Sequence, residues 1–435
     1  MKYDQRGLAV SSASDAEIDA LNRFVNDFMG ARDAAAAILD FADSHQGCAL
    51  VQASAAVLHL YSQATAEIEA RARPLLNRAR ALSGEVSERE RLFIQALSAW
   101  ADNDFVSAKV LLEQVAASWP RDIVSAKIAE FLLFEAPEYQ RHLQFMEGIA
   151  GPNADLSSFK AMHSFALELN AQYQQAERIA HDAIEMDVQT PWAHHTLAHV
   201  FLNQGRIAEG IATFGGLAPT WTQHISALQG HNTWHLALLY LAALNVERVM
   251  DLYRSRVWGF IPDNVFEQVD AISLLWRVEL AGCFREDEWI EIAPYIEARA
   301  TEQVFPFLNA HYVYALGRAG KQEEARCSID LMREFADRQD GEAARVWRGV
   351  GVPLAQACLA YAENNHPRAA LLLEPIIEQL PCVGGSDAQN DLFRQTYLVS
   401  LIEMRQQRKA AEMLAAWIGP RGPTALEQYW LDRTR

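Results

Sequence analysis

The sequence predicts an all-α fold, built as a right-handed solenoid of antiparallel helix pairs. Apolar residues recur at helical spacing along most of the 435-residue chain, while the alternating runs and turn dipeptides of β-hairpins are absent. A short motif also returns at multiples of thirty-four residues, which is typical of a helical repeat array. The chain is long enough for one extended array of this kind.

The N-terminal part is expected to be helical but irregular. Ser14 and Asp15 can begin a helix that runs through Phe28, and two further helices are predicted over roughly 33–41 and 49–70. We therefore divide the chain into an N-terminal helical cap, 1–90, and a repeat array, 91–435.

The repeated motif is an apolar or polar residue followed three positions later by a small one. Tyr173-x-x-Ala176 is followed thirty-four residues later by Ile207-x-x-Gly210 and preceded, at twice that interval, by Phe105-x-x-Ala108. The same cadence starts at Gln322 and at His366. Thirty-four residues is the tetratricopeptide period, in which a small residue lets two helices cross closely. The spacing stretches over 215–230 and 259–264, where loop insertions are expected.

The amino-acid composition of the chain argues against some classes of binding partner. A net charge of -18 without a basic stripe argues against nucleic acid. The five cysteines are scattered, as in reduced cytoplasmic proteins. Because the sequence also lacks a signal peptide and a long apolar run, we expect a cytoplasmic protein with no membrane partner. The oligomeric state is not predicted.

The stretch 191–238 holds six of the thirteen histidines. The tetratricopeptide resemblance implies that Trp192, His195 and His199 face the concave side of the array. His195 and His199 are four residues apart and so share one helical face. This pattern predicts a concave, histidine-rich pocket.

Further polar residues are expected to line the same pocket. Aligning the following repeat places His231 at the groove with His235 beside it, flanked by Asn232 and Trp234. On the next helix, an acid, a hydroxyl and a guanidinium share a face at helical spacing. The three residues that share this face are Asp270, Ser273 and Arg277. Later in the chain, Asn309 and His311 are also expected to line the pocket.

Several alternatives stay open for these residues. H-x-x-x-H is half of a zinc site, although Thr196 stands where a metalloprotease has its glutamate. A divalent metal would take His195, His199 and His231, and no other cofactor motif is evident. Otherwise the histidines form a polar layer bonded to backbone carbonyls. Tryptophans at helical spacing either wall a pocket or belong to the core.

Asp270 and Arg277 allow two interpretations. They can form a structural ion pair along one helix. Alternatively, Asp270 orients an imidazole and Arg277 grips a carboxylate or phosphate of a ligand.

Several of these segments resemble the tetratricopeptide repeat protein 38 family. The resemblance rests on AHHTLAHVFLNQGRIAEGI, GHNTWHLAL, DAISLLWRVEL, FLNAHYVYALGRAG and GGSDAQNDLF, and it covers roughly residues 90–420. It implies a divergent helical-repeat protein without a firmly assigned activity. The family tends to read G-G-S-H-A-Q-R-D near the C-terminus, where this chain has Asp387 for the histidine and Asn390 for the arginine.

The leading hypothesis is a pocket that binds a small anionic molecule, with hydrolysis or proton transfer by histidine and aspartate as a fitting reaction. Whether the protein is an enzyme stays open. The alternative is a non-catalytic scaffold that binds a peptide or a partner protein. The expected catalytic residues are His195, His199, His231, His235 and Asp270. The expected substrate-binding residues are Arg277, Trp192, Asn232, Trp234, Asn309 and His311.

Overall fold

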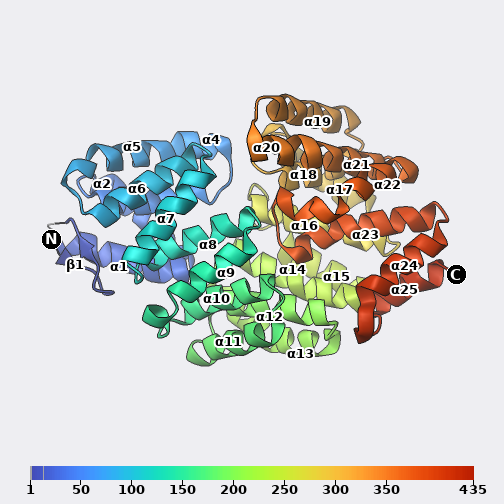
Figure 1. Ribbon diagram of the computed structural model, residues 1–435, viewed down its shortest axis with the longest axis horizontal. Coiled ribbons are helices and arrows are strands. Elements are labelled where there is room, and N and C mark those ends of the chain that lie inside the picture. The colour runs from blue at the N-terminus through green and yellow to red at the C-terminus, as the bar shows by residue number, and fades with distance from the viewer. Residues whose placement is uncertain (1, 13) are drawn as a thin grey trace. The chain divides into compact units, whose positions relative to one another are not determined.

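The computed structural model describes residues 2–12 and 14–435, and within them the fold is all-α helical repeat, as predicted (Figure 1). The strands found there are two short ones, β1 (Lys2–Tyr3) and β2 (Ala9–Val10), which pair antiparallel. The chain divides into two compact units. Unit 1 comprises 1–197 with 220–228, and unit 2 comprises 198–219 with 229–435.

The helices of the two units are as follows. Unit 1 contains α1 (Asp15–Met29), α2 (Ala37–Ser44), α3 (Ala49–Leu60), α4 (Thr65–Glu67), α5 (Arg73–Ala81), α6 (Glu88–Ala101), α7 (Phe105–Ser118), α8 (Ile123–Glu135), α9 (Tyr139–Gly148), α10 (Ser157–Leu169) and α11 (Tyr173–Met186). The division falls within α12 (Pro191–Gln204) and α14 (Ser226–Ala242). Unit 2 contains α13 (Ile207–Leu217), α15 (Val246–Leu252), α16 (Val265–Leu280), α17 (Glu286–Ile296), α18 (Pro306–Arg318), α19 (Gln322–Asp337), α20 (Gly341–Val346), α21 (Val352–Ala362), α22 (His366–Leu373), α23 (Asp387–Glu403), α24 (Gln407–Ile418) and α25 (Ala425–Arg433).

The repeated motif marks the start of the second helix in each pair. Its first residue is also the first residue of α7, α11, α13, α19 and α22. The residue two positions before each motif has a left-handed backbone. The N–H of the residue that follows it donates to the carbonyl five residues earlier in the chain, and this hydrogen bond ends the first helix of the pair in a Schellman turn. The left-handed residues are Asn103, Ala171, Gly205, Gly320 and Asn364.

The small residue of the motif lies where two helices cross, as predicted. A Cβ added at Gly210 of α13 would lie 2.8 Å from Leu239 of α14 and 3.1 Å from Phe201 of α12. Any larger side chain would push these helices apart. The corresponding alanines of the other motifs are fully buried.

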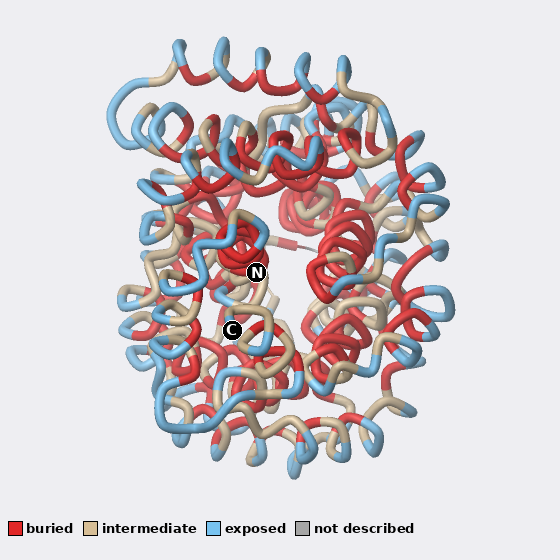
Figure 2. Tube along the Cα trace, turned by 90° about the vertical axis from the view of Figure 1, so that its right-hand side faces the viewer, coloured by how far each residue is buried: buried red, intermediate tan, exposed pale blue. Residues whose placement is uncertain are grey.

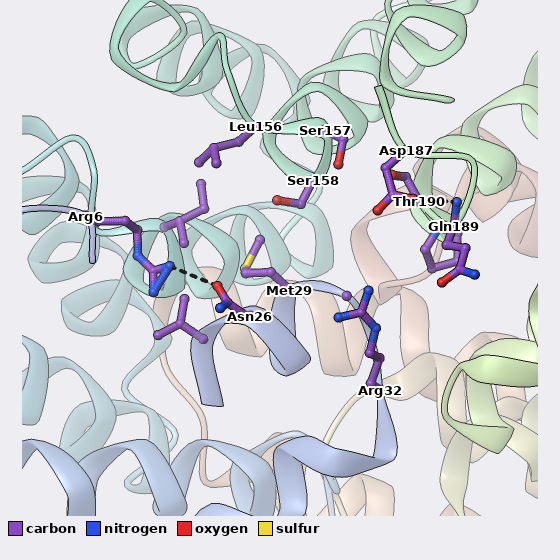
Figure 3. Close-up of a pocket in the computed structure, with 14 residues that line it drawn as sticks. Arg6, Asn26, Met29, Arg32, Leu156, Ser157, Ser158, Asp187, Gln189 and Thr190 are labelled. Carbon is purple, nitrogen blue, oxygen red and sulfur yellow. Dashed lines mark hydrogen bonds between the residues drawn. The ribbon is translucent and has the colours of Figure 1, made fainter. Parts of the chain in front are cut away.

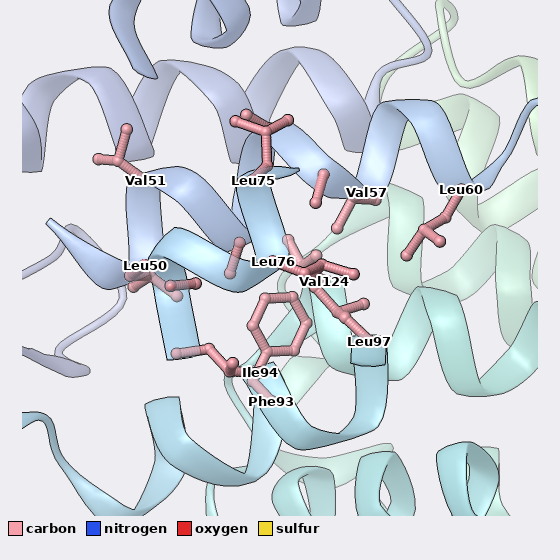
Figure 4. Packing of buried hydrophobic residues seen from close by; sticks show 14 of the residues in the cluster. Leu50, Val51, Val57, Leu60, Leu75, Leu76, Phe93, Ile94, Leu97 and Val124 are labelled. Carbon is pink, nitrogen blue, oxygen red and sulfur yellow. The ribbon is translucent and has the colours of Figure 1, made fainter. Parts of the chain in front are cut away.

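The first part of the chain has its own apolar core. Leu50, Val57, Leu76, Phe93 and Leu97 come from α3, α5 and α6 and pack together (Figure 4). Helix α6 packs on α3, α5 and α7 within unit 1. The expected boundary of the cap at residue 90 stays a prediction.

The helices are of two kinds, which differ in how much of their circumference is buried. Some, such as α16 and α18, are buried around nearly their whole circumference, whereas α11 and α19 expose one side along their length. Figure 2 shows both kinds, as helices that are red nearly throughout and helices whose turns alternate between red and pale blue. The first kind is the first helix of its pair, and polar residues on it therefore need partners inside the protein.

Two local predictions are wrong. The single helix expected over 49–70 ends at Leu60, because Gln63 takes a left-handed backbone before α4 begins. The loop expected over 215–230 is helical instead. Helix α13 continues to Leu217, a 3-10 helix follows over 218–223, and buried Phe214 and Trp221 fix both to the interior. By contrast, 259–264 is a loop, as expected. Among the described residues, each helix is too short or too polar to cross a bilayer.

Candidate functional site

The predicted site residues are divided between the two units. Unit 1 holds Trp192 and His195, on the first half of α12. Unit 2 holds the larger group, which comprises His199, His231, Asn232, Trp234, His235, Asp270, Arg277, Asn309 and His311. The residues of unit 2 that surround His231, His235 and His199 are called the histidine–carboxylate cluster below.

The best-defined pair of the cluster joins α14 to α16. Nδ1 of His231 lies 3.1 and 3.0 Å from the two carboxylate oxygens of Asp270. An ionised carboxylate only accepts, so Nδ1 carries the proton and donates it. In the neutral ring this leaves a lone pair on Nε2. The Asp270 side chain is 4% exposed and that of His231 is 17% exposed, so a buried carboxylate orients a ring that solvent still reaches.

A second histidine–carboxylate pair joins the end of α12 to α23. Nδ1 of His199 lies 3.0 Å from Oδ1 of Asp387, and Nδ2 of Asn203 donates to Oδ2 of the same carboxylate at 2.8 Å. Partial loss of solvent opposes ionisation of Asp387, whose side chain is 41% exposed, but the hydrogen bonds from His199 and Asn203 outweigh this effect and lower its pKa. Asp387 is thus ionised at neutral pH and fixes the His199 ring.

His235 connects the two pairs. Its ring centroid lies 4.8 Å from that of His231 and 4.8 Å from that of His199. Because His231 and His235 are one helical turn apart on α14, their rings project from the same side of that helix. Three imidazoles and two carboxylates are therefore contiguous in unit 2.

Arg277 has different partners from those predicted. The expected ion pair with Asp270 is replaced by hydrogen bonds to the Ser273 hydroxyl at 2.7 Å and to the carbonyls of Ala388 and Gln389 at 2.5 and 3.2 Å. Burial lowers the pKa of Arg277 to about 10, so it stays charged at neutral pH. This guanidinium binds the first turn of α23 to α16, and its donors are directed at protein oxygens.

Trp234 belongs to the interior. Its side chain is fully buried, and its Nε1 donates to the Ser273 hydroxyl at 3.1 Å. Its ring stacks on His231 with centroids 5.4 Å apart and an interplanar angle of 10°. Trp234 therefore fixes one face of His231, while Asp270 fixes its edge. Asn232, the neighbour of His231 on α14, is buried as well.

Asn309 and His311 lie on α18 and bond to backbone carbonyls. Asn309 donates to Glu302 at 3.0 Å, and Nδ1 of His311 contacts the Phe307 carbonyl at 2.8 Å. Burial lowers the pKa of His311 to about 3, and the charge of Arg277 acts in the same direction. His311 is therefore neutral, as in the polar-layer alternative.

The predicted residues of unit 1 lie against aromatic rings and a cation. His195 contacts Phe165 and Trp192, with centroids 4.9 and 5.7 Å away, and Lys127 lies over the Trp192 ring at 4.2 Å. His194 is buried, and its Nδ1 accepts from Nε1 of Trp221 at 3.1 Å.

Two contributors to the cluster were not predicted from the sequence, and neither was Asp391, an acid on the same helix as Asp387. Asp387 was noted as a departure from the family pattern, but its pairing with His199 was not predicted. Nothing in the sequence marked Asn203 as a site residue except its position one turn after His199. Asp391 lies one turn after Asp387. Burial raises its pKa to about 6, against the opposing effects of Arg277 and Gln395.

The comparisons with known proteins leave the family open. No family model matches the sequence. A chain of the structure described as Naa15/Naa10 bound to HypK-THB is similar at 13% identity, over 93% of this chain and 63% of that one, with a TM-score of 0.25. This chain thus spans less than two thirds of the matched chain's length, and a TM-score this low carries no functional argument.

Proposed function

We propose that unit 2 binds a small molecule at the histidine–carboxylate cluster and that His231 acts there as a general base. One observation carries this proposal, namely the contact between Nδ1 of partly exposed His231 and the buried carboxylate of Asp270. A carboxylate in this position fixes the tautomer that leaves Nε2 able to take a proton, and it stabilises the imidazolium that results.

Hydrolysis is the reaction that this arrangement suits best. Nε2 of His231 would take a proton from water as its oxygen attacks a carbonyl, and would then return the proton to the departing group. His199, oriented by Asp387 and Asn203, would contact the bound molecule from the other side of His235. Arg277 is not part of the proposal as an anion-binding group, because its donors already face protein oxygens.

A divalent metal ion at this cluster is an alternative to the general-base role, because a metal bound to Nε2 of His231 would occupy the lone pair that otherwise takes the proton. Metal-bound histidines commonly direct their other ring nitrogen at a carboxylate, as Nδ1 does in both His199 and His231. In this alternative, Asp270 and Asp387 would orient the two metal-bound histidines. Metal analysis of the purified protein tests this alternative, with His231→Ala expected to lose the metal.

The alternative, a scaffold for a peptide, is less well supported at this position. A peptide groove presents exposed polar side chains, whereas His199, His235 and Asp270 are at most 3% exposed. Membership of the tetratricopeptide repeat protein 38 family and a cytoplasmic location also stay proposals, supported by the sequence features from which they were predicted.

The test uses a panel of small nitrophenyl esters and phosphate esters with wild type, His231→Gln, Asp270→Asn and His181→Gln. The first two variants should lose activity by roughly 10²- to 10⁴-fold, the usual contribution of a positioned general base. The control His181 is an exposed histidine on α11, and its variant should keep wild-type activity. Full turnover by His231→Gln would rule the proposal out.

A further inference from the structure

A cavity of about 140 Å³ lies wholly within unit 1 and is separate from the histidine–carboxylate cluster (Figure 3). Its wall is made by the N-terminal leader, the end of α1, the start of α10 and the segment before α12. One water needs roughly 10–15 Å³ on this measure, so the cavity has room for a group of several heavy atoms.

Two arginines face this cavity. Arg6 and Arg32 flank Met29, and Ser158 points into the space between them (Figure 3). Arg6 reaches Asn26 only through a long 3.5 Å hydrogen bond, and its Nη2 is buried without a partner among the described residues. Arg32 lies 3.7 Å from Asp27, with a side chain that is 39% exposed. Neither guanidinium has the close bidentate carboxylate that buried arginines usually acquire.

The start of α10 adds hydrogen-bond donors on the opposite wall. Its N-cap residue is Leu156, which has no side-chain oxygen with which to cap the helix. Ser157 and Ser158 carry the first backbone N–H groups of this 13-residue helix, and both residues line the cavity. Unpaired N–H groups at a helix start attract anions.

One acid faces the same space. Asp187 lines the cavity, and its Oδ1 accepts from the backbone N–H of Gln189 at 2.9 Å. The two arginines outweigh this single carboxylate, so the lining is cationic. Asp187 and Gln189 offer acceptors for hydroxyl groups of a ligand. An anionic group with a hydroxylated remainder therefore fits the lining better than a bare ion or an apolar molecule.

We infer that this cavity binds a small, hydroxylated phosphate ester, with its phosphate between Arg6, Arg32 and the start of α10. The arginines supply charge-assisted hydrogen bonds, Ser157 and Ser158 supply backbone and hydroxyl donors, and Asp187 accepts from the ligand's hydroxyls. This site is independent of the proposed function, since all its residues belong to unit 1.

Calorimetric titration of the full chain with glycerol phosphate, inorganic phosphate and malonate, at fixed ionic strength, tests the inference. Glycerol phosphate should bind more tightly than inorganic phosphate, and both more tightly than malonate. Arg32→Gln and Arg6→Gln should each weaken binding about 10- to 100-fold, as expected for loss of a hydrogen bond to a charged group. Ser158→Asp, which places a carboxylate in the cavity, should abolish it.

The matched control is Arg23→Gln. Arg23 is an exposed arginine of α1 that is not part of the cavity lining, so its loss should leave binding unchanged. Thermal unfolding of each variant without ligand checks that it folds. Absence of binding by wild type, or equal binding by wild type and by folded Arg32→Gln and Ser158→Asp, would overturn the inference. Tighter binding of malonate than of the phosphates would overturn the assignment to a phosphate ester.

Discussion

Arginines in the two units have opposite surroundings. In unit 2, Arg277 is 1% exposed and donates to the Ser273 hydroxyl and to two carbonyls at the start of α23. In unit 1, Arg6 and Arg32 face a cavity and have only distant partners. The first arrangement holds two helices together, and the second leaves charge available to a ligand. The residue type alone does not distinguish these roles.

Histidines show the same contrast. His231 of unit 2 has a carboxylate on Nδ1 and a tryptophan on its ring face. His142 of unit 1 is fully buried, and both of its nitrogens lack hydrogen-bond partners among the described residues. A histidine with an orienting acid is prepared for proton transfer, whereas one without partners is held neutral by burial.

The largest expected effect on stability comes from Arg277. Arg277→Ala removes the guanidinium that joins the Ser273 hydroxyl of α16 to the carbonyls of Ala388 and Gln389 on α23, and it leaves a space at a fully buried position. We therefore expect the free energy of unfolding to fall by about 3 kcal/mol. Arg32→Ala should change it by no more than about 0.5 kcal/mol, as at most exposed positions. Urea unfolding of both variants measures the difference. Similar losses for the two would remove the contrast between the arginines.

His142 should make the protein less stable in mild acid. Burial lowers its folded-state pKa to about 3, with smaller effects from Lys127 and His163, so below pH 6.5 the unfolded chain binds the proton more readily. Stability should therefore fall as the pH drops from 6.5 toward 3. Relative to wild type, His142→Leu should gain about 2 kcal/mol between pH 7 and pH 5. A difference between the two proteins that does not vary with pH would contradict this.

The smallest effect is expected at Asp391, and it has the opposite sign with pH. The folded-state pKa of about 6 lies above the ordinary value, so ionisation of Asp391 destabilises the fold as pH rises from 4 through 6. Asp391→Asn removes that cost. Its stability relative to wild type should grow by roughly 1 kcal/mol from pH 4 to pH 7, after allowance for partial exposure. Denaturant unfolding at several pH values would reveal a constant difference if this is wrong.

The helix pairs could be predicted because their signal is local. The motif residue that begins α7, α11 and α13 follows a left-handed turn, and that geometry repeats wherever the spacing does. The prediction of a loop over 215–230 was wrong for a non-local reason. The longer repeat spacing suggested an insertion there, yet burial of Phe214 and Trp221 keeps that segment helical.

Most residues of the site could be predicted from the sequence, but which of them contact one another could not. His231 and Asp270 were both selected from helical spacing, and the contact between them depends on how α14 packs on α16. Asp387 lies 188 residues from His199, and no local pattern connects the two. The cavity beside Arg6 and Arg32 was missed because its wall combines the leader with helices far along the chain.

The central claim is that Asp270 sets the tautomer of His231, and nitrogen-15 NMR of the imidazole tests it most directly. In wild type at alkaline pH, the neutral His231 ring should carry its proton on Nδ1 and show an unprotonated Nε2 signal. Asp270→Asn should shift the population toward the Nε2–H form. A wild-type ring already protonated on Nε2, or a tautomer unchanged by Asp270→Asn, would contradict the account.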